Sequence, residues 1–181
     1  MGGFYAKKVV SVNGNELSIG GIRTEDISEM VSAYGQVGWP EKPALYTKYV
    51  QYQKDGTRDI LVARFENRFA GYLTIKWQSD YPPFKDAQIP EINDFSVLTH
   101  LRRHGIGSRL MDEAESRVSQ RSDRVGIGVG LTPDYGPAQK FYVRRGYVPD
   151  ARGLMSNDEP VDYGQKITVG DQLVLYFTKD L

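Results

Sequence analysis

Apolar residues along this chain recur at two spacings, and each spacing predicts a different kind of element. Apolar and polar residues that roughly alternate predict strands at 17–22, 58–64, 68–77, 90–98, 125–131 and 171–179. Apolar residues three and four apart predict helices at 24–32, 44–54, 106–120 and 133–145. Because strands and helices are mixed along the chain, the pattern predicts an α/β domain around a mixed sheet.

The length of the chain limits how many domains it can form. Its 181 residues are enough for one domain with a core and few for two, so we predict a single domain over residues 1–181. Residues 1–15 are polar and contain glycine, which predicts either a flexible extension or an early hairpin around Asn13 and Gly14. A polar loop is predicted over residues 153–164.

Composition and charge narrow the classes of function. The 23 basic residues balance 23 acidic ones, so the net charge indicates neither nucleic acid nor an anionic membrane as a partner. The absence of cysteine excludes disulfides, thiolate zinc sites and a cysteine nucleophile. Because His100 and His104 are the only histidines, we predict no metal site. No apolar run reaches the roughly 20 residues of a membrane span, and the N-terminus lacks a signal-peptide core, so a cytoplasmic location is expected.

The stretch Arg102–Gly107 joins a predicted strand to a predicted helix through two glycines. The first N–H groups of a helix lack intrahelical partners and carry partial positive charge. Glycine lets a phosphate approach the backbone, and Arg102 and Arg103 add fixed charge. The stretch therefore predicts a phosphate or pyrophosphate site, with a tight turn that binds no ligand as the alternative. It matches neither the Walker loop GxxxxGK[ST] nor the dinucleotide pattern GxGxxG.

A second motif lies in the predicted helix 133–145, which has the sequence PDYGPAQKFYVRR and is followed by Gly146 and Tyr147. Pro137 suits the first turn of a helix, and Gly146 suits the position just after its end. In the strand before this motif, residues 125–131, three glycines interrupt the apolar run. They indicate either a ligand close to the strand or tight packing.

Together the two motifs resemble those of the GNAT family of N-acetyltransferases. Residues 102–107 match the family's acyl-CoA pyrophosphate pattern Q/R-x-x-G-x-G/A, and residues 138–147 resemble its signature A-x-x-x-Y-x-x-x-G-F. The resemblance implies a mixed, mostly antiparallel sheet of about six to seven strands flanked by helices, in which a splayed strand pair forms the acetyl-CoA cleft. It also implies a monomeric or homodimeric enzyme that transfers an acetyl group from acetyl-CoA directly to a primary amine of a small molecule or peptide, without a metal. The alternative is a catalytically silent acyl-CoA sensor or interaction module on the same fold.

The resemblance also assigns residues to the cofactor. Those implied to contact the pantetheine arm or the pyrophosphate are Val97, Leu98, Arg102, Arg103, His104, Gly105, Ile106, Gly107, Ser108, Gly136, Ala138, Gln139 and Tyr142. Two positions depart from the family pattern. Arg103 stands where glycine is common, and Tyr135 stands where an asparagine usually contacts pantetheine.

Direct transfer needs a base for the acceptor amine and an acid for the leaving thiolate. Tyr142 matches the family's tyrosine acid, with a core tyrosine as the alternative. Glu91 lies eleven residues before Arg102, the offset at which histone-type members hold their base, and Asp94 is the reserve base or a substrate anchor. Alternation puts the two carboxylates on opposite faces of the strand unless a bulge intervenes. The alternative for either carboxylate is a solvated residue at the sheet edge.

Aromatic residues are the candidates for the acceptor site. They are Trp39, Tyr46, Trp77 and Tyr81, with core or helix packing as the alternative. Aromatic faces near acids are compatible with a cationic amine through cation–π contact. They are equally compatible with a peptide N-terminus or a small antibiotic, so the acceptor stays open at this point.

Overall fold

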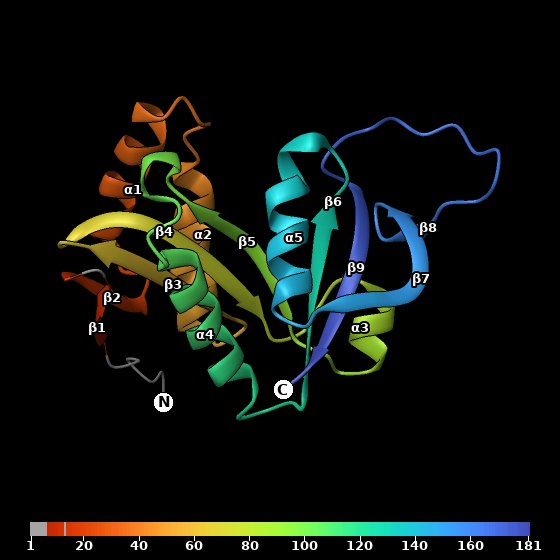
Figure 1. Ribbon diagram of the computed structural model, residues 1–181, viewed down its shortest axis with the longest axis horizontal. Coiled ribbons are helices and arrows are strands. Elements are labelled where there is room, and N and C mark those ends of the chain that lie inside the picture. The colour runs from red at the N-terminus through yellow and green to blue at the C-terminus, as the bar shows by residue number, and fades with distance from the viewer. Residues whose placement is uncertain (1–6, 13) are drawn as a thin grey trace. The chain divides into compact units, whose positions relative to one another are not determined.

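The computed structural model describes residues 7–12 and 14–181. The strands in these residues are β1 (Lys8–Val12), β2 (Asn15–Gly21), β3 (Arg58–Phe65), β4 (Arg68–Lys76), β5 (Glu91–Val97), β6 (Arg124–Gly130), β7 (Val148–Ser156), β8 (Glu159–Pro160) and β9 (Leu173–Asp180). They form one hydrogen-bonded sheet in the order β1-β2-β3-β4-β5-β6-β9-β7-β8 (Figure 1). β5 and β6 pair in parallel, whereas β1–β2, β2–β3, β3–β4, β6–β9, β7–β9 and β7–β8 pair antiparallel. The mixed, mostly antiparallel α/β sheet is confirmed, but within the described residues it has nine strands in place of the predicted six to seven.

The helices in the described residues are α1 (Asp26–Gln36), α2 (Pro43–Lys54), α3 (Pro82–Asp86), α4 (Ile106–Val118) and α5 (Gly136–Arg144). Two short 3-10 turns precede α4 and α5, at Thr99–Leu101 and Pro133–Tyr135. Four of the five helices coincide with predicted ones. α3 is an addition, because five residues are too few to show helical periodicity.

Three strands lie outside the predicted set, and each depends on its partner in the sheet. β1 pairs with β2 up to Val12 and Asn15, so the described part of residues 1–15 forms the hairpin alternative, while residues 1–6 and 13 lie outside the described residues. β7 and β8 replace part of the loop predicted at 153–164. β7 contains Pro149 and Gly153, residues that are depleted in strands, and its ladder with β9 is interrupted between Pro149 and Leu154.

The chain divides into two compact units. Among the described residues, unit 1 comprises residues 7–12, 14–77 and 93–117, and unit 2 comprises residues 78–92 and 118–181. The first two residues of β5 belong to unit 2 and the rest of the strand to unit 1. The single domain predicted from chain length stays a prediction.

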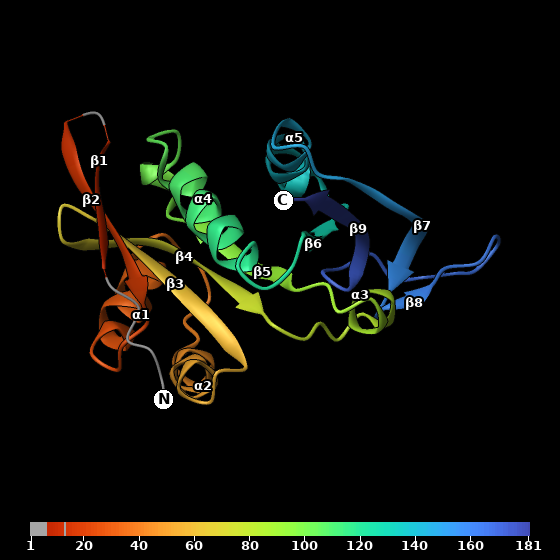
Figure 2. The ribbon, with the colours of Figure 1, turned by 90° about the horizontal axis from the view of Figure 1, so that it is seen from below.

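In unit 1, α1 and α2 cover one face of β3 and β4, and α4 lies on the opposite face (Figure 2). The helical spacing in the sequence explains this packing. Met30 and Tyr34, four residues apart on α1, are buried together with Tyr46 and Tyr49 on α2. They pack in one cluster with apolar side chains of the sheet, including Tyr72 on β4. Burial of each such side chain contributes roughly 1.5–3 kcal/mol.

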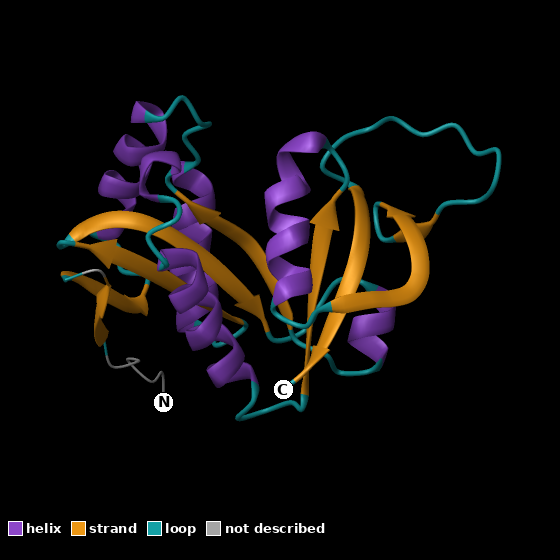
Figure 3. Ribbon diagram, in the orientation of Figure 1, coloured by secondary structure: helices purple, strands orange, loops and turns teal. Residues whose placement is uncertain are grey.

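In unit 2, α5 covers one face of β6 and β9, and α3 lies on the other (Figure 2), while a long loop joins β8 to β9 (Figure 3). The glycines of β6 are explained by packing within this unit. A Cβ on Gly126 would overlap the ring of Phe84 on α3, and one on Gly130 would lie 2.6 Å from the ring of Tyr135. Of the two alternatives for these glycines, tight packing accounts for them.

Candidate active site

The predicted phosphate-binding stretch forms a strand, turn and helix in unit 1. β5 ends at Val97, the 3-10 turn Thr99–Leu101 follows, and α4 begins at Ile106. In the connection, Arg103 and Gly105 have φ angles of +66° and +79°, in the left-handed region. Left-handed residues among right-handed ones direct successive N–H groups toward one side, which forms a concavity for an anion. Arg103 adopts at this position a conformation that glycine would adopt without strain.

The first N–H groups of α4 are available to a ligand. Among the described residues, no hydrogen-bond acceptor lies within reach of the backbone N–H of Ile106, Gly107 or Ser108. The first bond at the start of the helix runs from Arg109 N to Gly105 O at 3.1 Å. These donors and the partial positive charge of the helix N-terminus fit the pyrophosphate of acetyl-CoA.

Arg102 is oriented by two contacts within unit 1. Its Nε donates to Val97 O at 3.2 Å, and its guanidinium carbon lies 5.5 Å from the ring centroid of Trp39. His104 Nδ1 lies 3.0 Å from Arg102 O. The side chains of Arg102 and Arg103 are exposed, and both residues belong to the turn, so each adds a positive charge to this segment.

The two glycines of the turn have different roles. Gly105 has the left-handed backbone, and a Cβ there would lie 3.5 Å from Val12, an ordinary contact. A Cβ on Gly107 would lie 3.1 Å from Phe95 on β5, so Gly107 lets α4 pack on the strand. Gly105 is therefore the position at which a substitution tests the turn with less effect on packing.

The strand end that the resemblance assigns to pantetheine is already partly bonded within unit 1. Leu98 N donates to Ala70 O at 2.9 Å, and Leu98 O accepts from Leu101 N at 2.9 Å. Val97 O accepts from Arg102. Because a carbonyl oxygen has a second lone pair, these carbonyls can still accept a hydrogen bond, whereas the Leu98 N–H is engaged.

Asp94 interrupts β5 with a φ of +49°. A left-handed residue inside a strand is typical of a bulge, and such strain is concentrated at functional sites. The Tyr49 hydroxyl donates to the Asp94 carboxylate, and the hydroxyls of Tyr34 and Ser96 share a hydrogen bond. Asp94 and Ser96 therefore project from β5 toward α1 and α2, whereas Phe95 projects toward α4.

Four tyrosines form one cluster in unit 1, and Tyr49 is the one that donates to the Asp94 carboxylate. The ring centroid of Tyr46 lies 6.1 Å from that of Tyr34, 6.5 Å from that of Tyr49 and 6.0 Å from that of Tyr72. Burial raises the pKa of all four hydroxyls, and the negative charge of Asp94 raises each of them further. The pKa of Tyr46 is raised to about 12. All four hydroxyls therefore stay neutral near pH 7.

The structure brings together two of the four predicted acceptor residues. Tyr46 belongs to the tyrosine cluster, and Trp39 stacks on Tyr34 with centroids 5.5 Å apart. Trp77 lies elsewhere in unit 1, where its Nε1 donates to Asp59 at 3.0 Å. Tyr81 belongs to unit 2. Tyr34, Tyr49, Tyr72 and Ser96 were not among the four predicted acceptor residues, although the three-residue spacing of Tyr46 and Tyr49 places both on one side of α2.

In unit 2, the predicted base Glu91 is buried, with 3% of the residue exposed. Its Oε2 accepts a hydrogen bond from Ser79 Oγ at 2.6 Å, and Ser79 Oγ accepts one from Tyr81 N at 3.1 Å. The parallel ladder pairs Glu91 with Gly126. Its carboxylate is thus oriented by Ser79, and its role as the base stays a prediction.

Tyr81 lies in a compact aromatic cluster of unit 2. Its ring stacks on Tyr176 with centroids 3.7 Å apart and planes 6° apart. Its hydroxyl donates to Asp150 at 2.9 Å, and the Tyr176 hydroxyl donates to Asp158 at 2.5 Å. Burial raises the pKa of both tyrosines. These contacts indicate a core residue rather than an acceptor wall.

Tyr142, the predicted acid, is buried on α5 in unit 2. Its ring packs against Phe141 and Tyr147, with centroids 5.7 and 5.9 Å away. Burial raises its pKa, and Tyr135 adds a smaller contribution. Because the pKa is raised, the hydroxyl is protonated at neutral pH, which is the form that an acid must have.

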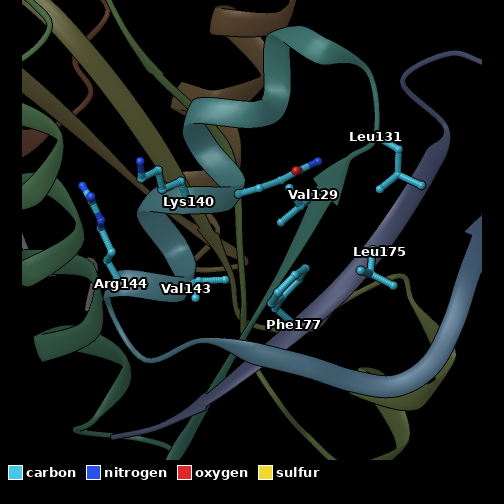
Figure 4. A pocket seen from close by; sticks show the side chains of 8 residues that line it. Val129, Leu131, Lys140, Val143, Arg144, Leu175 and Phe177 are labelled. Carbon is cyan, nitrogen blue, oxygen red and sulfur yellow. The ribbon is translucent and has the colours of Figure 1, made fainter.

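α5, β6 and β9 line a pocket of about 520 Å³ in unit 2 (Figure 4). The apolar side chains that line it are Val129, Leu131, Val143, Leu175 and Phe177. Lys140 and Arg144 extend away from them on one side of α5 in Figure 4. Gln139 is the predicted cofactor residue in this lining, and its Nε2 donates to Gly130 O at 2.9 Å.

The remaining residues that the resemblance assigns to the pantetheine arm lie near the start of α5. Gly136 is its first residue, and no described atom lies within 4 Å of the Cβ position there. Ala138 is half-buried one turn before Tyr142. Tyr135, in place of the usual asparagine, packs its ring over Gly130 and donates to Asp171 at 3.3 Å.

Two further properties concern the part of the chain that the structure describes. It contains no group of three or more histidine, aspartate or glutamate residues placed to hold a metal ion. It also contains no helix long and apolar enough to cross a membrane.

The mixed, mostly antiparallel sheet flanked by helices places the protein in the α/β class. A family model described as "Acetyltransferase (GNAT) family" matches residues 24–147, which include both motifs. The chain belongs to this family, and it is an N-acetyltransferase by class.

Solved structures of similar fold agree with this assignment. RimL, titled a ribosomal L7/L12 alpha-N-protein acetyltransferase, has a TM-score of 0.69 at 15% identity, over 99% of this chain and 97% of that chain. An acetyltransferase of Salmonella typhimurium, titled as modifying the N-terminal serine of L7/L12, has a TM-score of 0.69 at 10% identity, over 96% and 99%. RimL in complex with coenzyme A has a TM-score of 0.67 at 10% identity, over 96% and 98%. At these identities the similarity shows the fold. No curated protein sequence matches the chain.

Proposed function

We propose that this protein transfers the acetyl group of acetyl-CoA directly to a primary amine of a small molecule or a peptide. The observation that carries the proposal is the turn before α4. There, left-handed Arg103 and Gly105 and the N–H groups of Ile106, Gly107 and Ser108 form a donor set for a pyrophosphate. Family membership supports acetyl-CoA as the molecule that carries this pyrophosphate.

The proposed chemistry has three steps that side chains or backbone groups of this chain support. A base removes a proton from the acceptor amine, donors polarise the thioester carbonyl, and an acid protonates the thiolate of coenzyme A. Tyr142 supplies the acid, since its raised pKa keeps the hydroxyl protonated. Glu91 supplies the base, with its carboxylate oriented by Ser79.

Acetyl-CoA turnover with a panel of acceptors tests the proposal. The panel contains an alkyl amine, an aminoglycoside and a peptide with an N-terminal serine, the last chosen because similar folds are titled for that substrate. We expect release of coenzyme A that depends on one class of amine. Mass spectrometry should show a product heavier than the acceptor by about 42 Da, the mass that one acetyl group adds. Tight binding of acetyl-CoA with no turnover of any amine would instead support the silent acyl-CoA module.

A further inference from the structure

The carboxylate of Asp94 is a negative charge that no basic side chain neutralises. Among the described residues, no lysine, arginine or histidine lies within ion-pairing distance of it, and its partner is the neutral hydroxyl of Tyr49. The residue is exposed on β5, so a ligand can reach it. Its left-handed backbone holds the side chain on the face of the sheet where α1 and α2 lie.

A cluster of aromatic side chains adjoins this charge through Tyr49, which donates to it. The Tyr49 ring packs against those of Tyr46 and Tyr72, and the negative charge of Asp94 raises the pKa of Tyr34, Tyr46, Tyr49 and Tyr72. A carboxylate beside aromatic rings attracts an organic cation in two ways, by direct charge and by the negative faces of the rings.

One hydroxyl of the cluster is left without a protein partner. Among the described residues, no hydrogen-bond partner lies within reach of the Tyr46 hydroxyl. Only 2% of the residue is exposed, but its oxygen is not sealed from solvent. An ammonium group has three N–H donors and needs acceptors for them. The Asp94 carboxylate and the Tyr46 oxygen are two acceptors of the kind that it needs.

The cluster is connected to the phosphate-binding turn within unit 1. Ser96 bonds to Tyr34, Tyr34 stacks on Trp39, and Trp39 carries the guanidinium of Arg102 over its ring. β5 also joins the two features: it ends at Val97, just before the turn, and Asp94 lies three residues before that end. This chain of contacts links the cluster to the turn that the proposed function assigns to acetyl-CoA.

We propose that Asp94, Tyr46 and Tyr49 bind the positively charged amino group of the acceptor. The inference rests on the proposed function and names its acceptor class: alkyl amines that are protonated in solution, in preference to neutral arylamines or alcohols. Asp94 holds the ammonium group, Tyr49 orients the carboxylate, and Tyr46 accepts one further N–H. Asp94 acts here as a positioning and specificity residue, and the proton transfer belongs to another group.

The test measures binding without turnover, so that it does not depend on the proposed function. n-Hexylamine and n-hexanol, which differ in charge and share an alkyl chain, are titrated calorimetrically into the protein, with and without coenzyme A. We expect hexylamine to bind at least 10-fold more tightly than hexanol. Asp94→Asn should weaken hexylamine roughly 10–100-fold and leave hexanol unchanged, because it removes a charge-assisted hydrogen bond.

Matched variants separate the site from general effects of charge and folding. Asparagine tolerates the left-handed backbone as aspartate does, so Asp94→Asn should fold normally. Asp86→Asn removes the same charge from an exposed position on α3 and should leave both affinities unchanged. Tyr46→Phe should weaken hexylamine by roughly 2–10-fold, the effect of one neutral hydrogen bond.

Equal affinity for amine and alcohol, or equal amine affinity in wild type and Asp94→Asn, would overturn the inference. Either result would leave the proposed acetyl transfer standing. Conversely, a protein that fails to bind coenzyme A but binds hexylamine through Asp94 would contradict the proposed function and support the cation site. For an acceptor that turns over, Asp94→Asn should raise its KM with kcat within a few-fold of wild type.

Discussion

Both units of the molecule combine buried tyrosines with carboxylates, but they satisfy their polar groups differently. In unit 2, the hydroxyls of Tyr81 and Tyr176 each donate to a carboxylate of their own, and the two rings stack closely. In unit 1, one exposed carboxylate, that of Asp94, lies beside four tyrosines, and the Tyr46 hydroxyl has no partner among the described residues. Polar groups that satisfy one another stabilise a fold, whereas groups that are left open can bind a ligand. The same residue types therefore predict stability in one unit and recognition in the other.

Tyr142→Phe should have the largest effect on activity, and it tests an exception to this contrast. Tyr142 is buried among aromatic rings of unit 2, as a structural tyrosine would be, yet it is the proposed acid. The change removes only the hydroxyl, so kcat should fall by roughly 10²–10⁴-fold while acetyl-CoA affinity and Tm stay close to wild type. Steady-state kinetics and thermal denaturation measure these quantities. A variant that melts early but turns over normally would make Tyr142 structural, like Tyr81.

Gly105→Asp should next test the open donors of unit 1. It places a side chain and a negative charge beside the proposed pyrophosphate site, so coenzyme A affinity should fall by at least about 100-fold in calorimetric titration. Gly56→Asp is the matched control, because Gly56 has a left-handed backbone as Gly105 does. Its Cβ position has open space around it, and it is distant from the turn in sequence. Unchanged affinity in Gly105→Asp, or an equal loss in both variants, would remove the turn from the cofactor site.

Glu91→Gln sharpens the comparison between the two carboxylates of β5. Direct transfer requires a neutral amine, and an alkyl amine with a pKa near 10 is mostly protonated at pH 7. If Glu91 is the base, kcat/KM at pH 7 should fall by roughly 10–100-fold, and less at pH 9.5, where free amine is abundant. Asp94→Asn should lower kcat/KM through KM with little change in this pH dependence. The reverse pattern would assign the base to Asp94.

The smallest expected effect is a difference in thermal stability between Tyr81→Phe in unit 2 and Tyr46→Phe in unit 1. Tyr81→Phe breaks a hydrogen bond to Asp150 and should lower the free energy of unfolding by about 1 kcal/mol, or Tm by about 2–4 °C. Tyr46→Phe breaks no described hydrogen bond and should leave Tm unchanged. Burial raises the pKa of Tyr81 above the unfolded value near 10, so the unfolded chain loses its proton first and this stability declines as pH rises past about 10. Equal Tm losses in both variants would contradict the contrast.

The sequence by itself determined the six predicted strands, four of the helices and the position of the turn before α4, which we propose binds the pyrophosphate. These features depend on local periodicity, on glycine at one left-handed position, and on the N–H groups that every helix start leaves free. Family membership also followed from two short motifs, because their residues are constrained by local backbone geometry and by contact with one ligand.

Only the tertiary structure decided which aromatic residues lie near Asp94, where we propose that the acceptor binds, and which lie elsewhere. Tyr46 and Tyr81 were both predicted to line the acceptor site, yet Tyr46 lies in the cluster near the Asp94 carboxylate, whereas Tyr81 is stacked on Tyr176 and bonded to Asp150. The strands β7 and β8 likewise form because β9 and β7 supply their hydrogen-bond partners, against unfavourable residues such as Pro149. Ladder partners and cross-element contacts join residues far apart in the chain, and no local pattern encodes such pairings.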